Sequence, residues 1–292
     1  MPVTSSRRDV LNFGCGTAAA IGVSAVATAL GPVPAAAQGA SNPSAEDFFY
    51  REDWFGEPWR KPETAVLVHG NAESSIEWYA WMPRMAQEFR VLRPDLPGFG
   101  RSRIPAGFAW SLPSLATFVA HVLDKAGIDS AHIIGAKAGG TIAMQFAADY
   151  PARTRTLSVV SGPASAPPTL AYADPAQIPQ ADRLGSAASK EMVDYWAKMF
   201  KTAPKIPTQG LRNAITDLAK DGVLQRIKAP TLVLTGDQSK LQSVEQALQY
   251  QRLIPNSRLV VLRSDAYHIA AVNAEECVAN VLSFIRGARQ KA

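Results

Sequence analysis

The feature that most constrains the fold is a series of short, almost wholly apolar runs separated by stretches with helical spacing. The runs lie at residues 65–68, 91–92, 132–134, 157–160, 232–234 and 259–262. The helical stretches lie at 83–89, 112–126, 138–150 and 274–286. Strands that are apolar throughout are buried on both faces, as in a parallel sheet. The alternation therefore predicts a doubly wound, mostly parallel α/β sheet flanked by helices.

The alternation breaks between residues 161 and 228, where a segment rich in Pro and Ala precedes helical spacing at 192–200 and 211–218. We therefore expect an inserted helical cap, residues 163–228, over the carboxyl edge of the sheet. The α/β core would then consist of residues 38–162 and 229–292. The aromatic-rich segment 48–59 is expected to form an edge hairpin or a surface strap.

Residues 1–37 form a predicted export leader. The pair Arg7-Arg8 precedes an uncharged run of small and apolar residues, 15–30, and Ala35-Ala36-Ala37 provides a small-x-small cleavage site. The run is shorter than the roughly 20 residues that span a bilayer. This pattern resembles a twin-arginine signal peptide with Val10 where Phe is common. It predicts transport by the twin-arginine export machinery, cleavage before Gln38, and a periplasmic or secreted protein.

Composition limits the other classes of function. The chain has 292 residues, of which 47% are apolar and 19% charged, enough for a sizeable globular core. The net charge of +5 is scattered along the chain, so we expect no nucleic-acid partner. Of the two cysteines, Cys15 lies in the leader. Cys277 lies on an apolar helical stretch, where we expect a small buried hydrophobe.

The strongest local motif is Ile-Ile-Gly-Ala-Lys-Ala-Gly-Gly at residues 133–140, which passes from a predicted strand into a predicted helix. Small residues on both sides of Lys137 suit a sharp turn that presents its side chain at a helix N-terminus. This is the spacing of the nucleophile elbow, G-x-S-x-G, with lysine in place of serine. A second strand ends at His69-Gly70-Asn71. The N–H groups of Asn71 and Ala138 are candidate oxyanion-hole donors, and we expect His69 to be structural.

Two further polar residues follow predicted strands. Asp237 comes directly after the run 232–235, and His268 comes shortly after the last strand. The elbow, the acidic residue and the histidine come in this order along the chain, as they do in α/β-hydrolases. Residues 95–102, Asp-Leu-Pro-Gly-Phe-Gly-Arg-Ser, add a loop typical of that superfamily. The chain resembles the α/β-hydrolase superfamily over most of its length after the leader. The likeness is greatest to the smaller esterase, C–C hydrolase and haloperoxidase-type members. It implies a catalytic group of Lys137, Asp237 and His268, in which Asp237 pairs with His268 and His268 faces Lys137.

Lysine at the elbow changes the chemistry that the resemblance implies. Acyl transfer to serine gives an ester that water can cleave, whereas transfer to Lys137 would give a stable amide. One interpretation is hydrolysis of a small, partly apolar carbonyl substrate (ester, lactone or C–C bond). In it His268, oriented by Asp237, activates water and Lys137 stabilises developing negative charge. The analogy with the fold favours this interpretation slightly.

Two alternatives stay open. Lys137 could form an imine with a ketone or aldehyde and serve a retro-aldol or decarboxylation reaction, which requires a neutral amine. The chain could instead be a non-catalytic ligand-binding protein in which Lys137 is a binding cation. We predict that no cofactor or metal is required, because the sequence contains no Walker loop, no dinucleotide fingerprint after the first strand and no cluster of His or Cys ligands.

Overall fold

The computed structural model describes residues 48–165 and 178–290, which leaves the predicted leader and its cleavage site outside the described residues. In this part of the chain one sheet of seven strands has the order β1-β3-β2-β4-β5-β6-β7. Strand β1 is antiparallel to β3, and all other neighbouring pairs are parallel. The strands are β1 Tyr50–Asp53, β2 Thr64–Val68, β3 Arg90–Pro94, β4 Ala131–Ala136, β5 Thr154–Val160, β6 Thr231–Gly236 and β7 Ser257–Leu262.

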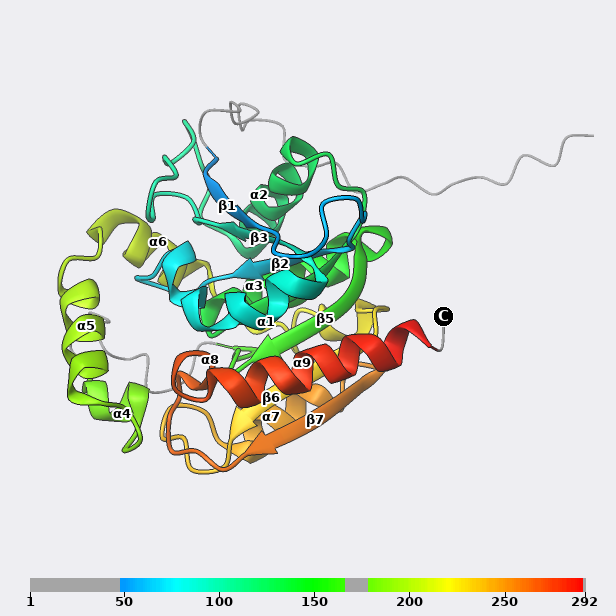
Figure 1. Cartoon of the computed structure of the whole chain (residues 1–292). Helices are drawn as coiled ribbons and strands as arrows, with labels where there is room; N and C mark the ends of the chain where they lie inside the picture. The colour runs from blue at the N-terminus through cyan, green and yellow to red at the C-terminus, as the bar shows by residue number, and fades with distance from the viewer. Residues whose placement is uncertain (1–47, 166–177, 291–292) are drawn as a thin grey trace, which may run out of the picture. The chain divides into compact units, whose positions relative to one another are not determined.

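Helices cover both faces of the sheet, which confirms the predicted doubly wound class (Figure 1). The helices before β5 and after β6 are α1 Met82–Glu88, α2 Leu112–Lys125, α3 Ala138–Asp149, α7 Val244–Gln251, α8 Ile269–Val272 and α9 Ala274–Arg289, and short 3₁₀ turns are η1 Ser75–Trp81, η2 Pro151–Arg153 and η5 Leu224–Arg226. Because side chains alternate along a strand, Val66 and Val68 pack with α2, α3 and α7, whereas Ala65 and Leu67 pack with α1 and α9.

The stretch between β5 and β6 contains three helices, α4 Gln180–Leu184, α5 Lys190–Lys201 and α6 Lys205–Ala214. They lie together at one side of the sheet, on the left in Figure 1. The expected helix at 211–218 is wrong in its bounds, because α6 ends at Ala214. Leu211 and Leu218 are both buried, but they belong to different segments of the same core. Helix α7 was not predicted from the sequence.

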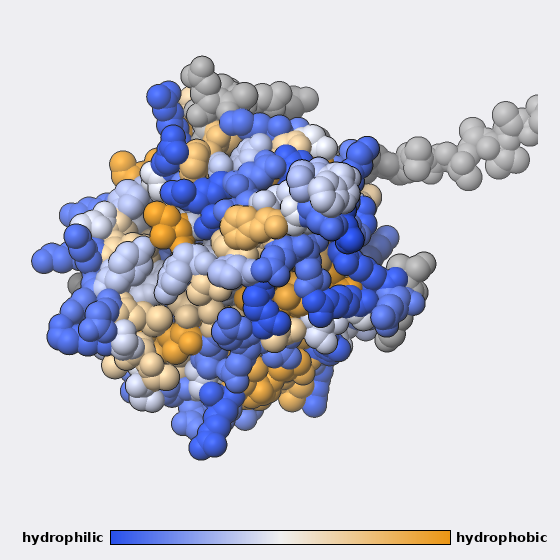
Figure 2. All heavy atoms as spheres, viewed as in Figure 1, coloured by the Kyte–Doolittle hydropathy of each residue, from blue (hydrophilic) through white to orange (hydrophobic). Residues whose placement is uncertain are grey.

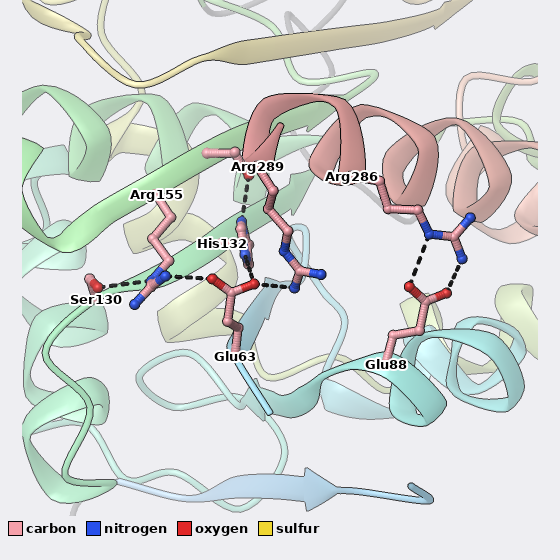
Figure 3. Close-up of polar contacts among 8 residues, drawn as sticks. Glu63, Glu88, Ser130, His132, Arg155, Arg286 and Arg289 are labelled. Atoms are coloured by element: carbon pink, nitrogen blue, oxygen red, sulfur yellow. Dashed lines mark hydrogen bonds and ion pairs between the residues drawn. The ribbon is translucent and has the colours of Figure 1, made fainter. Parts of the chain in front are cut away.

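A polar network centred on Glu63 lies at the amino ends of the central strands, away from the strand ends that carry Lys137 and His268 (Figure 3). The Glu63 carboxylate pairs with Arg155 at the start of β5, with Arg289 near the end of α9, and with His132 in β4 at 3.5 Å. His132 Nδ1 also lies 2.9 Å from the Thr156 hydroxyl. Burial lowers the pKa of His132 to about 4, so the ring is neutral at pH 7.

Exposed apolar side chains are distributed over the surface. On the face shown in Figure 2 they form separate areas among hydrophilic residues. The large exposed examples come from distant segments, such as Trp59 before β2, Tyr79 in η1 and Ile206 in α6. Among the described residues, no helix combines the length and the hydrophobicity that a membrane crossing requires. Cys277 is buried and free, as expected.

Candidate active site

The turn between β4 and α3 has the geometry that the elbow motif predicts. Lys137 is the N-cap of α3 and has φ 52° and ψ −125°, a strained conformation for a residue with a side chain. The flanking glycines make this turn possible. A Cβ on Gly135 would lie 2.2 Å from the Gly139 carbonyl oxygen, and one on Gly139 would lie 2.2 Å from that of Val68. The Lys137 N–H donates to the Val160 carbonyl at 3.0 Å, which ties the turn to β5.

The Lys137 side chain crosses to the loop after β2 and pairs with a glutamate. Its Nζ forms an ion pair with Oε1 of Glu73, whose other oxygen accepts a hydrogen bond from the Gly70 N–H at 2.9 Å. Gly70 permits this close approach, because a Cβ there would lie 2.8 Å from Lys137 Cε and 2.7 Å from Glu73 Oε2. The His268 Nε2 atom lies 3.4 Å from the same Glu73 Oε1. Lys137 and His268 therefore meet at one carboxylate oxygen.

A second buried glutamate, Glu77, faces His268 from η1. Its Oε2 lies 3.7 Å from His268 Nε2, and neither of its carboxylate oxygens has a hydrogen-bond partner among the described residues. Glu73, Glu77, Lys137 and His268 are only 3%, 3%, 4% and 1% exposed. Four ionisable groups thus share a space closed to solvent.

Burial determines the protonation of this cluster, because a low dielectric disfavours every charged form. It lowers the pKa of the Lys137 amine well below its usual range, and the charge of Arg183 lowers it further. Burial, followed by the charges of Lys137 and Arg183, lowers the pKa of His268. Burial raises the pKa of Glu77 well above its usual range. The site therefore favours a neutral imidazole and a protonated Glu77, and it makes the Lys137 amine easier to deprotonate than an exposed lysine.

Two helices from the stretch between β5 and β6 contact the cluster. Lys137 Nζ lies 5.6 Å from the ring centroid of Trp196 and 5.7 Å from that of Phe200, both in α5. The Trp196 ring also packs edge-to-face against His268, with centroids 4.6 Å apart. The Arg183 carbonyl, in α4, accepts a hydrogen bond from the His268 backbone N–H at 2.7 Å. Helices α4 and α5 therefore take part in positioning the histidine.

The structure shows no hydrogen bond between Asp237 and His268, the pair that the sequence predicted. Asp237 is exposed, and its Oδ1 accepts a hydrogen bond from the Ser264 N–H at 2.8 Å. The carboxylate is thus used to stabilise the turn that follows β7. Neither ring nitrogen of His268 has a hydrogen-bond partner among the described residues. The acidic groups that face this histidine are Glu73 and Glu77, which come from the opposite side of the elbow.

The candidate oxyanion donors lie on the two segments that flank Lys137. Ala138 is the first residue of α3, where a backbone N–H has no acceptor within the helix. Asn71 follows β2, and its side-chain amide donates to the Thr208 carbonyl in α6 at 3.0 Å. His69 has the structural role expected of it. Its Nδ1 lies 2.7 Å from the Gly70 carbonyl, and its Nε2 accepts the Leu96 N–H at 2.9 Å.

Glu73, Glu77 and His268 are also the residues of the described chain that come nearest to a metal-binding set. One donor atom from each lies within 4.8 Å of the others. The amine of Lys137 already forms an ion pair with Glu73 Oε1. We therefore assign Lys137 as the cationic partner of Glu73.

The sequence contains one signal for Glu73 and Glu77, neither of which was predicted as a site residue. They lie four residues apart, directly after the His-Gly end of an apolar strand. Residues at such a strand end converge on the site of an α/β sheet. Acidic residues near a chain turn are common, however, and burial of both could not be inferred from their spacing.

Comparisons with known proteins agree with this architecture. A family model described as the alpha/beta hydrolase fold matches residues 64–181. The crystal structure of a hydrolase from Pseudomonas aeruginosa PA01 superimposes with a TM-score of 0.71 and 25% identity. That superposition covers 82% of this chain and 94% of the other.

Two curated relatives match shorter segments. The dihydrolipoyllysine-residue acetyltransferase component of the acetoin cleaving system of Cupriavidus necator is 29% identical over 57% of this chain and 43% of its own length. The 2-hydroxy-6-oxo-2,4-heptadienoate hydrolase of Pseudomonas putida is 34% identical over 32% of this chain and 34% of its own. The match thus spans less than half of either relative.

Proposed function

We propose that this chain, a member of the α/β-hydrolase superfamily, hydrolyses an ester, lactone or carbon–carbon bond beside the carbonyl group of a small, partly apolar substrate. The observation that carries this proposal is the meeting of Lys137 and His268 at Glu73 Oε1, in a site closed to solvent at the elbow of the fold. The similarity to the P. putida hydrolase supports the same reaction class.

In this reaction His268 acts on water. Its ring is neutral, so Nε2 can accept a proton from a water molecule as that water attacks the substrate carbonyl. The oxyanion that forms would be stabilised by the N–H groups of Asn71 and Ala138 and by the N-terminus of α3. Lys137 completes the site as a hydrogen-bond donor. Trp196 and Phe200 favour an apolar group on the substrate.

An imine-forming lyase is the second candidate, and a specific observation favours it. The amine of Lys137 is buried, its pKa is lowered, and a carboxylate that can accept its proton is in contact with it. These are the conditions under which an amine adds to a ketone or aldehyde. A carbonyl substrate would then be held covalently, and a neighbouring bond would break with the imine as electron acceptor.

The experiment that tests the proposal is a turnover screen on short-chain activated esters, lactones, and mono- and diketones. We expect hydrolysis by the wild type and a loss of about 10²–10⁴-fold in His268→Gln, the usual contribution of a general base. Borohydride added during turnover would identify an imine by a mass increase on Lys137. Binding of these compounds without turnover would support the ligand-binding alternative and refute hydrolysis.

We also propose that the protein is exported through the twin-arginine machinery and acts outside the cytoplasm. This proposal rests on the leader sequence described above. Fractionation of the native host, with N-terminal sequencing of the purified protein, tests it. A chain in the cytosol that retains residue 1 would refute it.

A further inference from the structure

The site combines two groups that are not both needed for a simple hydrolysis or a simple imine reaction. His268 can deliver water, and Lys137 can add to a carbonyl, and both contact Glu73 Oε1. A substrate with one carbonyl would need only one of these groups to take part in bond formation. Attack of Lys137 on an ester would end at an amide that the site cannot use.

We infer that the substrate is a 1,3-dicarbonyl compound, such as a β-diketone, whose C–C bond is hydrolysed with Lys137 bound to one carbonyl while His268 directs water to the other. This inference rests on the proposed function and names its substrate class. The two carbonyls of such a compound are separated by one carbon. Both can therefore face the single space where the amine and the imidazole meet.

The steps balance without an oxidant or a cofactor. The Lys137 amine gives a proton to Glu73, adds to the first carbonyl and releases water, and the imine that forms takes this proton back. His268 takes a proton from a second water molecule, and the resulting hydroxide adds to the other carbonyl. The bond between that carbonyl and the central carbon breaks, releases a carboxylic acid and leaves its electron pair in an enamine on Lys137. The proton held by His268 moves to the enamine carbon, and water then cleaves the imine to give a ketone and the free amine.

The surroundings of Lys137 fit the charge changes of this sequence. The protonated imine is a cation, and Nζ lies beside Glu73 and within 5.7 Å of the Trp196 and Phe200 ring centroids. A carboxylate and aromatic faces both stabilise such a cation. Glu77, buried without a hydrogen-bond partner among the described residues, lies 3.7 Å from His268 Nε2. Burial raises the pKa of Glu77, so this group adds no second negative charge beside Glu73.

The test uses residues 38–292, the chain without its predicted leader. The probe is 1-phenyl-1,3-butanedione, and acetophenone is the matched monoketone. Cleavage is followed by loss of the diketone absorbance and by detection of one acid and one ketone. In ¹⁸O-water the label should enter the acid. We expect Lys137→Met to lose both cleavage and borohydride trapping. His268→Gln should retain trapping and lose cleavage by about 10²-fold or more.

Each outcome separates this inference from the proposed function. Cleavage of the diketone that survives in Lys137→Met, with that variant folded by circular dichroism, would overturn the inference and leave water activation by His268 standing. Hydrolysis of esters or lactones without cleavage of any β-diketone in a panel of aliphatic and aryl members would also overturn it. Failure to hydrolyse either class would refute the proposed function itself. If Lys137→Met does not fold, Lys137→Gln serves the same comparison.

Discussion

The ion pair between Lys137 and Glu73 makes a quantitative prediction about stability. Both side chains are almost fully buried, and Glu73 Oε1 has the Lys137 amine as its ion-pair partner. In Lys137→Met the methionine fills a similar volume, but the carboxylate loses its partner. Removing one member of a buried ion pair costs about 3–5 kcal/mol, because a buried charge is left uncompensated.

The double variant Lys137→Met/Glu73→Gln should recover much of this loss. The glutamine oxygen can still accept the Gly70 N–H, and no buried charge remains. Replacing both members of a buried pair is often nearly neutral. We expect the double variant to be about 2 kcal/mol more stable than Lys137→Met, because most of the cost of the single variant comes from the uncompensated charge of Glu73.

Urea unfolding monitored by circular dichroism and tryptophan fluorescence measures these differences. At constant m-value, the midpoints convert directly to free energies of unfolding. Lys190→Met, which breaks the exposed ion pair of Lys190 with Asp194, is the matched control and should change the midpoint little. The reasoning fails if Lys137→Met is as stable as the wild type. It also fails if the double variant is less stable than Lys137→Met.

Three further predictions follow from other parts of the structure. Burial lowers the pKa of His69 and of His132 to about 4. The unfolded chain therefore binds more protons than the folded one between about pH 6.5 and 4, and the free energy of unfolding should fall as the pH is lowered through that window. A urea midpoint that does not change between pH 7 and 5 would contradict this. Gly139→Ala should prevent folding or lower the free energy of unfolding by more than about 3 kcal/mol, because its Cβ would lie 2.2 Å from a backbone oxygen. Gly287→Ala is the control and should be neutral or slightly stabilising, since its Cβ would lie in open space. Thermal unfolding measures both. Asp237→Asn should leave turnover and borohydride trapping at Lys137 within about twofold of the wild type. A loss of turnover as large as that of His268→Gln would instead support the Asp–His pairing, which the structure does not show.

The sequence predicted the fold well because its signals are local. Fully apolar strands and their alternation with helices require a parallel sheet, and the glycines around Lys137 fix the elbow through short-range sterics. The order of strand ends also brought Lys137 and His268 to one site. Helix α6 was misplaced because Leu211 and Leu218 share a buried environment without sharing a helix.

The acid of the site could not be predicted in the same way, because its choice depends on side-chain direction. Asp237 and Glu73 both follow strands that end near the elbow. Which of them approaches His268 is decided by packing over a few ångströms. The turn after β7 uses Asp237 for its own backbone N–H, and Gly70 holds Glu73 towards the interior. The order of residues in the sequence indicates neither of these two arrangements.

The length of the lysine side chain explains why the acidic residues of the site lie on the segment that follows β2. A serine at position 137 would keep its reactive oxygen close to the turn, where a histidine oriented by an acid at the end of β6 could reach it. Lysine carries its reactive nitrogen several bonds farther, to the loop that follows β2 and to Glu73. A proton acceptor for that nitrogen must therefore belong to the β2 loop rather than to the end of β6. Glu73 and Glu77 occupy this position, and Asp237 is free to stabilise a turn. The lysine and the two glutamates are thus one chemical unit, and restoring a serine alone would leave His268 without the acid that a serine mechanism requires.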